Sequence, residues 1–486
     1  MGSFTDPAGQ PAPRILCGIL HATKSIAIES ADRKLRLSMR KKKTDVVIVG
    51  AGISGLTAAY ELKRAGHSVA VVEARDRVGG RTMEGKLLNR SFDLGGQWVG
   101  PTQKRVMALI HELGLETFPQ HASGYQLLEM KGKIGKYKGV IPKLPIFALL
   151  SADRTLKKIN RLASQLPLLE PWKAQFAEKL DGITAETWIQ KHVPTSTARE
   201  LIRIATRAIF SAEPSEISML FFLAYVRGAG TIEQLADVEG AAQQDRIKGG
   251  AFQIARKLAD RIGKTSTLLG SPVRSLTQTS TGVRLISDKW DISARYAIVA
   301  LSPSLTLGIN FGDRPPVERL TLARRMPMGS VTKAIVAYEK PFWRQQDMAG
   351  MAVSDRGPFG PVFDACLPDD DRGYLVGFLE GEEGRRYALS SEDQRKNAIL
   401  ENLVRFFGSE AARPLGYAEK NWTMDEWSGG CYTGLMIPGT LTRYGTLLRK
   451  PFGRIHWAGT ETATQWMGYF DGAVEAGQRA AREIMG

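Results

Sequence analysis

The sequence contains few of the residues that build disulfide frameworks or metal sites. Its 486 residues include only three cysteines and six histidines. Cys17, Cys366 and Cys431 are odd in number, widely separated and without a CxxC pair, so neither a disulfide framework nor a zinc site is expected. The histidines show no ligand spacing, and no metal site is predicted. Cysteine usage of this kind is typical of a reducing compartment, so the cytoplasm is the expected location.

Long apolar runs are also missing. The longest, residues 217–226, has about ten residues, whereas a membrane-spanning helix needs about 20. This run therefore predicts a buried helix. Residues 14–28 are too interrupted for the apolar core of a secretory signal, and no twin arginine is present. We expect no transmembrane segment and no export signal.

Positive charge is concentrated near the N-terminus. The chain carries a formal charge of +16, and residues 1–43 hold nine basic groups against three acidic ones. Three prolines precede the basic run, so these residues predict a flexible leader. A basic leader can attract nucleic acid or an anionic membrane. Such runs are more commonly solvated extensions, and a nucleic-acid partner is not expected.

A nucleotide-binding unit begins at Asp45. VVIVG predicts a buried strand, LTAAYELKRAG an amphipathic helix and SVAVVEA a second strand, which together form a βαβ unit. Between the first strand and the helix, Gly50 makes the turn, Gly52 lets a pyrophosphate approach the backbone and Gly55 allows close packing. Glu73 ends the second strand, where its carboxylate can accept from both ribose hydroxyls. This favours an unphosphorylated ribose, and both NAD and FAD remain open.

The rest of the chain alternates between two kinds of pattern. Residues 125–245 are mainly helical, whereas residues 248–310 are rich in strands and include a buried one at 296–301. Another strand is predicted at 331–338. This order predicts two domains interleaved in sequence after a leader. The expected ranges are 1–43 for the leader, 44–124, 246–310 and 415–486 for the nucleotide-binding domain, and 125–245 and 311–414 for the substrate-binding domain.

The C-terminal stretch predicts a strand at 455–458, a break at Gly459 and a helix starting near Gly468. Small and apolar residues recur on one side of this helix, which indicates close packing against a sheet. Its first turn is glycine-rich and free of Lys and Arg, so the bare N–H groups and the helix dipole would stabilise an anion. An ordinary packing helix is the alternative.

Six blocks of the sequence resemble one family. They are VVIVGAGISGL, VVEARDRVGGRT, DLGGQWVG, MPMGSVTKAIVAYEKPFW, NWTMDEWSGGCYTG and GRIHWAGTETATQWMGYFDGAVEAGQRAARE. Together they resemble the flavin amine oxidases, most of all the monoamine oxidase branch, over nearly all of residues 44–486. The resemblance implies a glutathione-reductase-like FAD domain of α/β class with a Rossmann-type βαβ unit. A substrate domain of α+β class, with mixed sheet and helices, would be interleaved with it.

The resemblance also implies which residues contact the FAD. They are Gly50, Gly52, Ser54, Gly55, Glu73, Ala74, Arg75, Gly80, Arg81, Gly95, Gly96, Gln97, Trp98, Val273, Trp422, Cys431, Gly459, Thr460, Glu461, Gly468 and Tyr469. From the sequence around it alone, Cys431 is an exposed and unhindered loop thiol. In the monoamine oxidases the matching cysteine holds the flavin 8α-carbon as a thioether, so a covalent flavin is expected here.

Three further residues match catalytic positions of the family. Tyr432 and Tyr469 match the two tyrosines of an aromatic cage in front of the flavin, where two rings can sandwich an amine. Lys333 lies early in an apolar strand, and a lysine there could simply reach out to water. The resemblance instead implies a lysine near flavin N5, linked by a water, that assists reoxidation.

The substrate pocket is less well defined by the sequence. Gln243 matches a pocket glutamine, and Leu235 and Ala236 fall where the family has gating residues. Because Ala236 is small, we expect one open cavity. The sequence departs from the family at 465–467, where Gln-Trp-Met replaces the common His-Trp-Ser, and at 433–436, where aromatic residues are usual. These departures leave the substrate's shape open.

The resemblance implies oxidative deamination of an amine. A hydride equivalent would pass from the α-carbon to flavin N5, and O2 would take the electrons, with aldehyde or ketone, ammonia and hydrogen peroxide as products. Alternatives are an L-amino acid oxidase using Arg227, a polyamine oxidase using Glu233 or Asp237, an amine dehydrogenase, and a nucleic-acid-associated demethylase. The chain ends at Gly486 without the membrane anchor of the mitochondrial members, so a soluble protein, as a homodimer, is expected.

Overall fold

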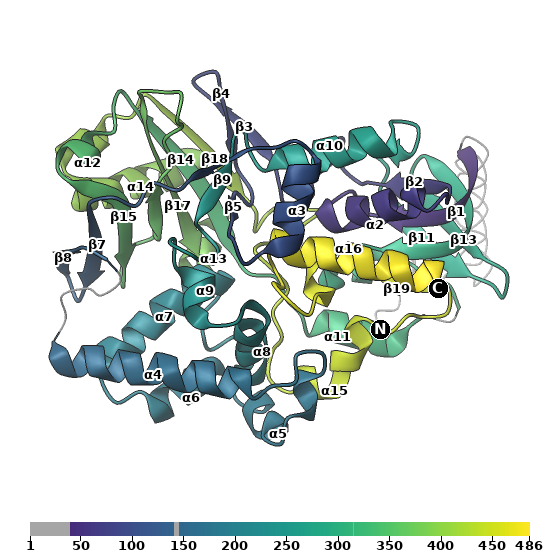
Figure 1. Ribbon diagram of the computed structural model, residues 1–486, viewed down its shortest axis with the longest axis horizontal. Coiled ribbons are helices and arrows are strands. Elements are labelled where there is room, and N and C mark those ends of the chain that lie inside the picture. The colour runs from purple at the N-terminus through teal and green to yellow at the C-terminus, as the bar shows by residue number, and fades with distance from the viewer. Residues whose placement is uncertain (1–38, 140–144, 314) are drawn as a thin grey trace, which may run out of the picture.

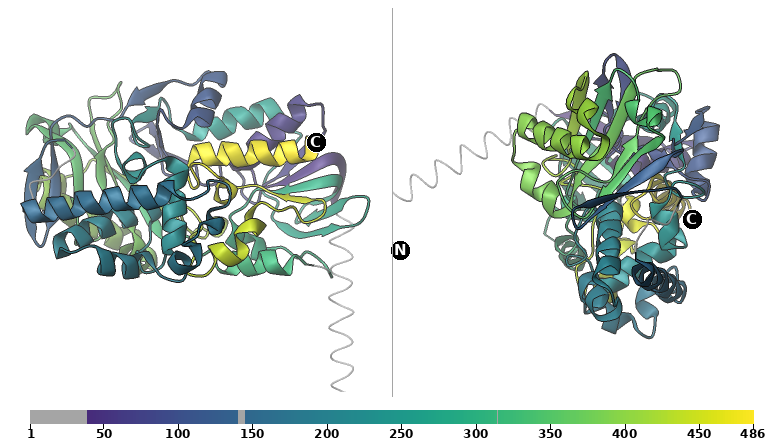
Figure 2. Two further views of the ribbon diagram at one scale, coloured as in Figure 1. Left: turned by 60° about the horizontal axis from the view of Figure 1, so that its bottom comes forward. Right: turned by 90° about the vertical axis from the view of Figure 1, so that its left-hand side faces the viewer.

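Two large sheets lie next to each other along the length of the molecule, and a group of helices packs against them (Figures 1 and 2). The computed structural model describes residues 39–139, 145–313 and 315–486. Most of the predicted leader, including Cys17, lies outside the described residues. Within the described ranges, none of the helices combines the length and the apolar character needed to traverse a bilayer.

The first sheet is parallel at its centre and antiparallel at one edge. Its order is β10 (Thr267–Leu268), β2 (Val69–Val72), β1 (Arg40–Val49), β13 (Trp290–Val299), β12 (Val283–Ser287) and β11 (Val273–Gln278), with β19 (Ile455–Trp457) beside β13. The strands β10, β2, β1, β13 and β19 run parallel, whereas β11, β12 and β13 are antiparallel neighbours. Strand β2 and the last four residues of β1 are apolar and buried, because both faces of the sheet are covered there.

The first strand starts earlier than predicted. Residues 40–43 were assigned to the flexible leader, but they extend β1 and pair in register with Trp290–Ser293 of β13. The side chains of this extension are largely exposed, so the lysines stay hydrated while the backbone completes the sheet. The Arg40 guanidinium lies 5.6 Å from the centre of the Trp290 ring. The run of charge therefore concealed the start of a strand, and these first residues pair with β13 but not with β2, an exposed position that suits charged side chains.

Helices cover the first sheet. They are α2 (Ile53–Arg64), α3 (Lys104–Glu112), α10 (Phe252–Ile262) and α16 (Phe470–Met485) on one face, with α11 (Val317–Arg324) packed over Trp457 on the other. Figure 1 shows the C-terminal helix α16 in yellow beside α2. A Cβ on Gly477 would lie 2.3 Å from the backbone oxygen of Ser54. The small face of this helix was predicted to pack on a sheet, but its tightest contact is with helix α2.

The second sheet has seven strands. Its order is β18 (Gly416–Asn421), β14 (Val331–Tyr338), β17 (Gly373–Glu380), β16 (Val362–Asp364), β15 (Met348–Ser354), β7 (Tyr125–Met130) and β8 (Lys133–Tyr137). The strand predicted at 331–338 is β14, and every residue of β14 and β17 is buried. The predicted boundary at residue 415 is wrong for β18, because this strand pairs with β14 rather than with the first sheet. The helices α12 (Phe342–Gln345), α13 (Gly381–Ala388) and α14 (Glu392–Phe407) pack on this sheet.

A helical layer lies below the two sheets in the view of Figure 1. It consists of α4 (Ile146–Ser164), α5 (Ala177–Asp181), α6 (Ala185–His192), α7 (Ser196–Phe210), α8 (Met219–Ala229), α9 (Ile232–Ala236) and α15 (Leu441–Tyr444). The apolar run predicted as a buried helix is α8, whose start is capped by the Ser218 hydroxyl accepting from Phe221 N. Short strands connect the layers: β3 (Glu84–Leu87), β4 (Arg90–Asp93), β5 (Trp98–Val99), β6 (Thr117–Pro119) and β9 (Asp245–Ile247).

Candidate active site

The glycine turn after β1 is built from backbone alone. Gly50 has a φ of +98°, a conformation that favours glycine, and a Cβ on Gly55 would lie only 2.0 Å from the Gly50 oxygen. These two glycines bring the start of α2 tight against the end of β1. Within the described chain, no side chain caps α2 and no atom lies within 4 Å of a Cβ built on Gly52. The first N–H groups of this helix therefore face open space.

The carboxylate of Glu73 joins the second strand to this turn. It is buried, and its Oε2 accepts from Ala51 N at 2.7 Å while its Oε1 accepts from Arg75 N at 3.0 Å. The Arg75 guanidinium in turn contacts Asp425 and donates to Ser428 Oγ at 2.8 Å. An acidic group at the end of β2 is thus connected to the loop that carries Cys431.

These residues fit a dinucleotide with an anionic pyrophosphate. The uncapped start of α2 offers N–H donors and the positive end of a dipole, and Gly52 leaves the room that a phosphate needs. Gly80 lies against Gly52, because a Cβ on Gly80 would be 3.3 Å from the Gly52 Cα. Ala74 follows Glu73 and is half-buried. Ser271 N donates to the Glu73 backbone oxygen, and Val273 begins strand β11 two residues later. The predicted cofactor residues of this region therefore lie around the carboxyl ends of strands β1 and β2.

A buried ion pair connects three further predicted residues. Arg81 Nη1 donates to Glu461 Oε1 at 2.7 Å and to the Tyr432 carbonyl oxygen at 2.7 Å, and Ser302 Oγ donates to the same carboxylate. Burial opposes the charge of both partners, but their mutual attraction raises the pKa of Arg81 and lowers that of Glu461. The pair is therefore charged, and it links loops that lie several hundred residues apart.

Two glycines allow the loop at 94–98 to pass close to its neighbours. A Cβ on Gly95 would lie 2.1 Å from the Arg81 oxygen, and a Cβ on Gly96 would lie 2.8 Å from the Phe470 ring. Beyond them, Trp98 donates through Nε1 to Gln120 Oε1 at 2.8 Å. This loop, which was predicted to contact the flavin, runs past the start of α16.

Lys333 points inward rather than to water. Its side chain is buried, and Nζ donates to the Gly95 oxygen at 2.8 Å and to Gln97 Oε1 at 2.5 Å. Burial lowers the pKa of this amine to about 7, although the nearby Asp93 carboxylate favours its charge and Arg246 opposes it. Gln97 Nε2 is buried and has no hydrogen-bond partner among the described residues. The lysine thus lies beside a polar group that is available to a ligand.

Cys431 is not the exposed thiol that its sequence context indicated. Its side chain is 5% exposed, and burial raises the pKa of the thiol to about 12 against the opposing effect of Arg81. The flanking glycine explains the difference, because a Cβ on Gly430 would lie 2.2 Å from the Gly329 oxygen. Because Gly430 has no side chain, the loop packs closely against Gly329, and Cys431 lies in the same buried cluster as Trp422.

The two cage tyrosines are brought together by their neighbours in the chain. A Cβ on Gly468 would lie 3.3 Å from the Thr433 Cβ, so the segments that carry Tyr432 and Tyr469 touch. Thr460 Oγ1 accepts from Gly468 N at 2.8 Å and donates to the Tyr469 oxygen at 3.0 Å. Thr460 follows Gly459, whose N donates to Ser54 Oγ at 2.9 Å. The predicted residues of the C-terminal motif therefore connect the cage to helix α2.

Each of the two tyrosine hydroxyls donates one hydrogen bond. The Tyr432 hydroxyl donates to Glu380 Oε1 at 2.6 Å, and the Tyr469 hydroxyl donates to the Leu235 oxygen at 3.2 Å. Gln243 Nε2 donates to the same oxygen at 3.1 Å, and its Oε1 is a buried acceptor without a partner in the described ranges. The pocket residues predicted at 235 and 243 thus adjoin Tyr469, whereas Ala236 is exposed at the end of α9.

Sequence reasoning missed Glu380 and Asp93. Glu380 is the last residue of the otherwise uncharged strand β17, and such an isolated acid was a signal that could have been used. Asp93 accepts from Ala251 N and Phe252 N at the start of α10, and burial raises its pKa. The Phe378 ring bridges the two sides of the site, 6.0 Å from the Tyr432 ring and 5.9 Å from Lys333 Nζ.

The residues named for alternative functions have other partners. Arg227 donates through Nε to the Leu166 oxygen at 3.1 Å, and Glu233 accepts from Asn160 Nδ2 at 2.8 Å. Asp237 is half-buried, and burial raises its pKa, with Glu233 adding to the effect. In the part of the chain that the structure describes, no three His, Cys, Asp or Glu side chains are grouped to hold a metal ion.

Comparison with known proteins identifies the family. A family model described as flavin containing amine oxidoreductase matches residues 53–485, and one described as pyridine nucleotide-disulphide oxidoreductase matches residues 12–91. A probable flavin-containing monoamine oxidase A of Dictyostelium discoideum is 41% identical over 442 residues, 90% of this chain and 97% of that protein.

Solved structures agree. Putrescine oxidase bound to putrescine has a TM-score of 0.89 and 32% identity, over 92% of this chain and 100% of that one. Cyclohexylamine oxidase from Brevibacterium oxydans has a TM-score of 0.87 and 34% identity, over 91% of this chain and 98% of that one. These matches confirm the predicted fold class.

Proposed function

The chain belongs to the family of flavin-containing amine oxidoreductases, and we propose that it oxidises a primary monoamine with O2 as the electron acceptor. As an FAD-dependent oxidoreductase, it catalyses oxidative deamination of amines. The proposed products are an aldehyde or ketone, ammonia and hydrogen peroxide. The cytoplasm and a homodimeric state remain predictions from the sequence.

One observation carries this proposal. The segments of Tyr432 and Tyr469 touch at Thr433 and Gly468, and the two hydroxyls are fixed by hydrogen bonds to Glu380 and to the Leu235 oxygen. Two tyrosine rings held in this way would offer their faces to a substrate, and such faces attract an ammonium or orient an amine. This arrangement favours a small amine over an anionic substrate.

The other residues of the chain would bind FAD and hold it in place. The glycine turn and the uncapped start of α2 would receive the pyrophosphate, and Glu73 would accept from a ribose. The bound flavin supplies the redox chemistry, taking a hydride equivalent from the substrate and passing two electrons to O2. Lys333 and Gln97 would offer hydrogen-bond donors beside the ring. Ionised Arg81 and Glu461 would fix the loops around it.

The substrate class is tested by reducing the holoenzyme without oxygen. Primary monoamines, diamines, polyamines, secondary amines and L-amino acids are each added anaerobically while the visible flavin absorbance is followed. Air is then admitted and peroxide is measured. Bleaching by monoamines with prompt peroxide release is the expected result. Bleaching that air does not reverse would identify a dehydrogenase, and no bleaching by any amine would contradict the proposal.

A diamine is the second candidate substrate. Glu233 and Asp237 flank the gating residue Leu235 on either side in sequence, and both residues are half-buried. A second ammonium would be attracted to these carboxylates. Selective loss of diamine oxidation in Asp237→Asn, with monoamine oxidation unchanged, would favour this reading.

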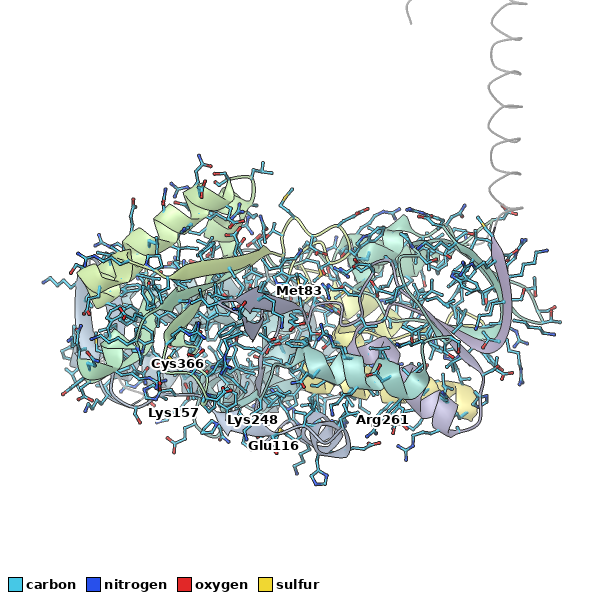
Figure 3. The ribbon with its side chains drawn as sticks, turned by 90° about the horizontal axis from the view of Figure 1, so that it is seen from above. Met83, Glu116, Lys157, Lys248, Arg261 and Cys366 are labelled. Carbon is cyan, nitrogen blue, oxygen red and sulfur yellow. The ribbon has the colours of Figure 1, made fainter. Side chains whose placement is uncertain are left out.

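We also propose a thioether between Cys431 Sγ and the flavin. The match within the SGGCYT block supports this bond. Cys366 is a matched control, because burial raises the pKa of its thiol to about 12 as well. Figure 3 shows it on the side of the second sheet. After acid precipitation, wild type and Cys366→Ala should give yellow pellets, and Cys431→Ala a colourless one. A colourless wild-type pellet would exclude the bond.

A further inference from the structure

Glu380 is a buried carboxyl at the edge of the tyrosine cage. It ends the strand β17 and is 5% exposed. Its Oε1 accepts the Tyr432 hydroxyl at 2.6 Å, whereas Oε2 is buried and makes no hydrogen bond to any described residue. A buried carboxyl oxygen without a hydrogen bond destabilises the folded protein, so a carboxyl at this position suggests a functional role.

The same carboxyl borders a cavity on its other side. The cavity has a volume of about 130 Å³, enough for several water molecules. Its wall includes Arg207 and Glu213 near the end of α7, Asp355 and Arg356 after β15, and Glu380, Glu382 and Glu383 at the start of α13. Two more of these acids, Asp355 and Glu383, have a buried carboxylate oxygen that accepts no hydrogen bond from any described residue. Water in this cavity would satisfy such oxygens, so Glu380 separates a wettable space from Tyr432.

Charges around Glu380 leave it ready to exchange a proton. Burial raises the pKa of this carboxyl to about 8, and Glu213 adds to the effect, while Tyr432, Arg207 and Ser211 act in the opposite direction. Glu382 and Glu383 add negative charge from α13, and Arg356 and Asp355 face the cavity from the opposite loop. Arg81 donates to the backbone oxygen of Tyr432.

We propose that Glu380 is a positioning residue for the proposed amine oxidation: it fixes the Tyr432 ring through the hydroxyl and, by exchanging a proton with the cavity, makes the rate of substrate oxidation depend on pH. An ionised carboxylate accepts a hydrogen bond about twice as strongly as a neutral group does. The cage ring is therefore held more firmly when Glu380 is ionised. The inference rests on the proposed role of Tyr432 in the cage.

The test compares two substitutions and one control in the FAD-loaded enzyme. Glu380→Gln keeps an acceptor for Tyr432 but cannot titrate, and Glu380→Leu removes the acceptor. Glu382→Gln changes an exposed acid on the same cavity that does not contact Tyr432. The rate of anaerobic flavin reduction is measured across pH, and infrared difference spectra below and above pH 8 report the carboxyl band without turnover.

We expect an ionisation near pH 8 in the reduction rate of wild type and Glu382→Gln, together with a protonated carboxyl band below that pH. Glu380→Gln should lose both the ionisation and the band, while its rate on the acidic side stays within a few-fold of wild type. Glu380→Leu should reduce flavin about tenfold more slowly than wild type above pH 8, because a hydrogen bond to a charged group is lost there, and it should be the slower of the two variants below that pH.

An unchanged pH profile in Glu380→Gln, or a wild-type rate in Glu380→Leu, would overturn the inference. If Glu380→Leu does not fold, the profile and the carboxyl band of Glu380→Gln decide alone. A wild-type enzyme whose flavin is reduced by no amine would instead overturn the proposed function, so the two failures are distinguishable.

Discussion

The two ends of the cofactor site are built on different principles. At the nucleotide end, Gly50, Gly55 and the uncapped start of α2 shape the site with backbone atoms that lie within a few residues of each other. At the cage end, side chains from distant segments meet, such as Lys333 on β14 with Gln97, and Tyr432 with Glu380. The first end should therefore be sensitive to added volume, and the second to lost charge and lost hydrogen bonds.

The largest effect is expected from Gly55→Ala. The new methyl would lie 2.0 Å from the Gly50 oxygen and 3.1 Å from the Ala300 Cβ, so helix α2 would have to move away from the sheet. Overpacking of this kind costs about 3 kcal/mol or more. We expect little folded holoenzyme, measured as soluble yield, melting temperature and bound flavin. A variant with wild-type stability would show that the turn is more adaptable than its geometry implies.

The next effect separates folding from cofactor binding. Gly52→Ala adds a methyl where no described atom lies within 4 Å, and Gly52 has a φ of −72°, which alanine adopts readily. The cofactor-free protein should therefore keep its melting temperature, while FAD affinity falls because the methyl occupies the proposed pyrophosphate site. Calorimetric titration of FAD into the cofactor-free protein measures this. Unchanged affinity would place the pyrophosphate elsewhere.

At the cage end, Lys333→Met tests the buried charge. Removing a preorganised donor beside developing charge typically costs a factor on the order of 10² in rate. We expect oxygen to reoxidise the reduced variant on the order of 10² times more slowly, as followed by stopped-flow absorbance. Lys340→Met changes an exposed lysine just beyond the same strand and should react like wild type. Normal reoxidation of Lys333→Met would remove Lys333 from this role.

The same contrast explains what the sequence could predict. Gly50, Gly52, Gly55 and Glu73 follow a local rule, and the structure arranges the turn and the acid as that rule describes. The burial of Cys431 was missed because it depends on Gly329, a residue about a hundred positions away. The start of β1 was missed because charge indicated a leader, whereas pairing with β13 decides the strand.

The cage roles rest on resemblance rather than on local pattern. No periodicity relates Lys333 to Gln97, and no spacing indicates that the Leu235 carbonyl receives both Tyr469 and Gln243. Glu380 is the residue whose surroundings the sequence predicts least, since its partner Tyr432 and the cavity beside it come from three separate segments. Tertiary contacts define these groups, so a single sequence cannot.

The last predicted effect concerns stability rather than cofactor binding or rate, and it is the contribution of the Glu380 carboxyl. Burial raises the pKa of this carboxyl from 4.5 to about 8, so between these values the folded protein keeps a proton that the unfolded chain has lost. Stability then falls as pH rises through this window, by at most about 1.4 kcal/mol per pH unit, and is flat with respect to this group below and above it.

The variant Glu380→Gln has no titrating carboxyl at this position and lacks this pH-dependent contribution to stability. The melting temperature of wild type relative to Glu380→Gln should therefore decline from about pH 4.5 to about pH 8. Glu382→Gln, whose carboxylate is exposed, should follow the wild type throughout. A constant difference between wild type and Glu380→Gln would mean that the carboxylate is already ionised in the folded protein and that the cage end tolerates a buried charge there.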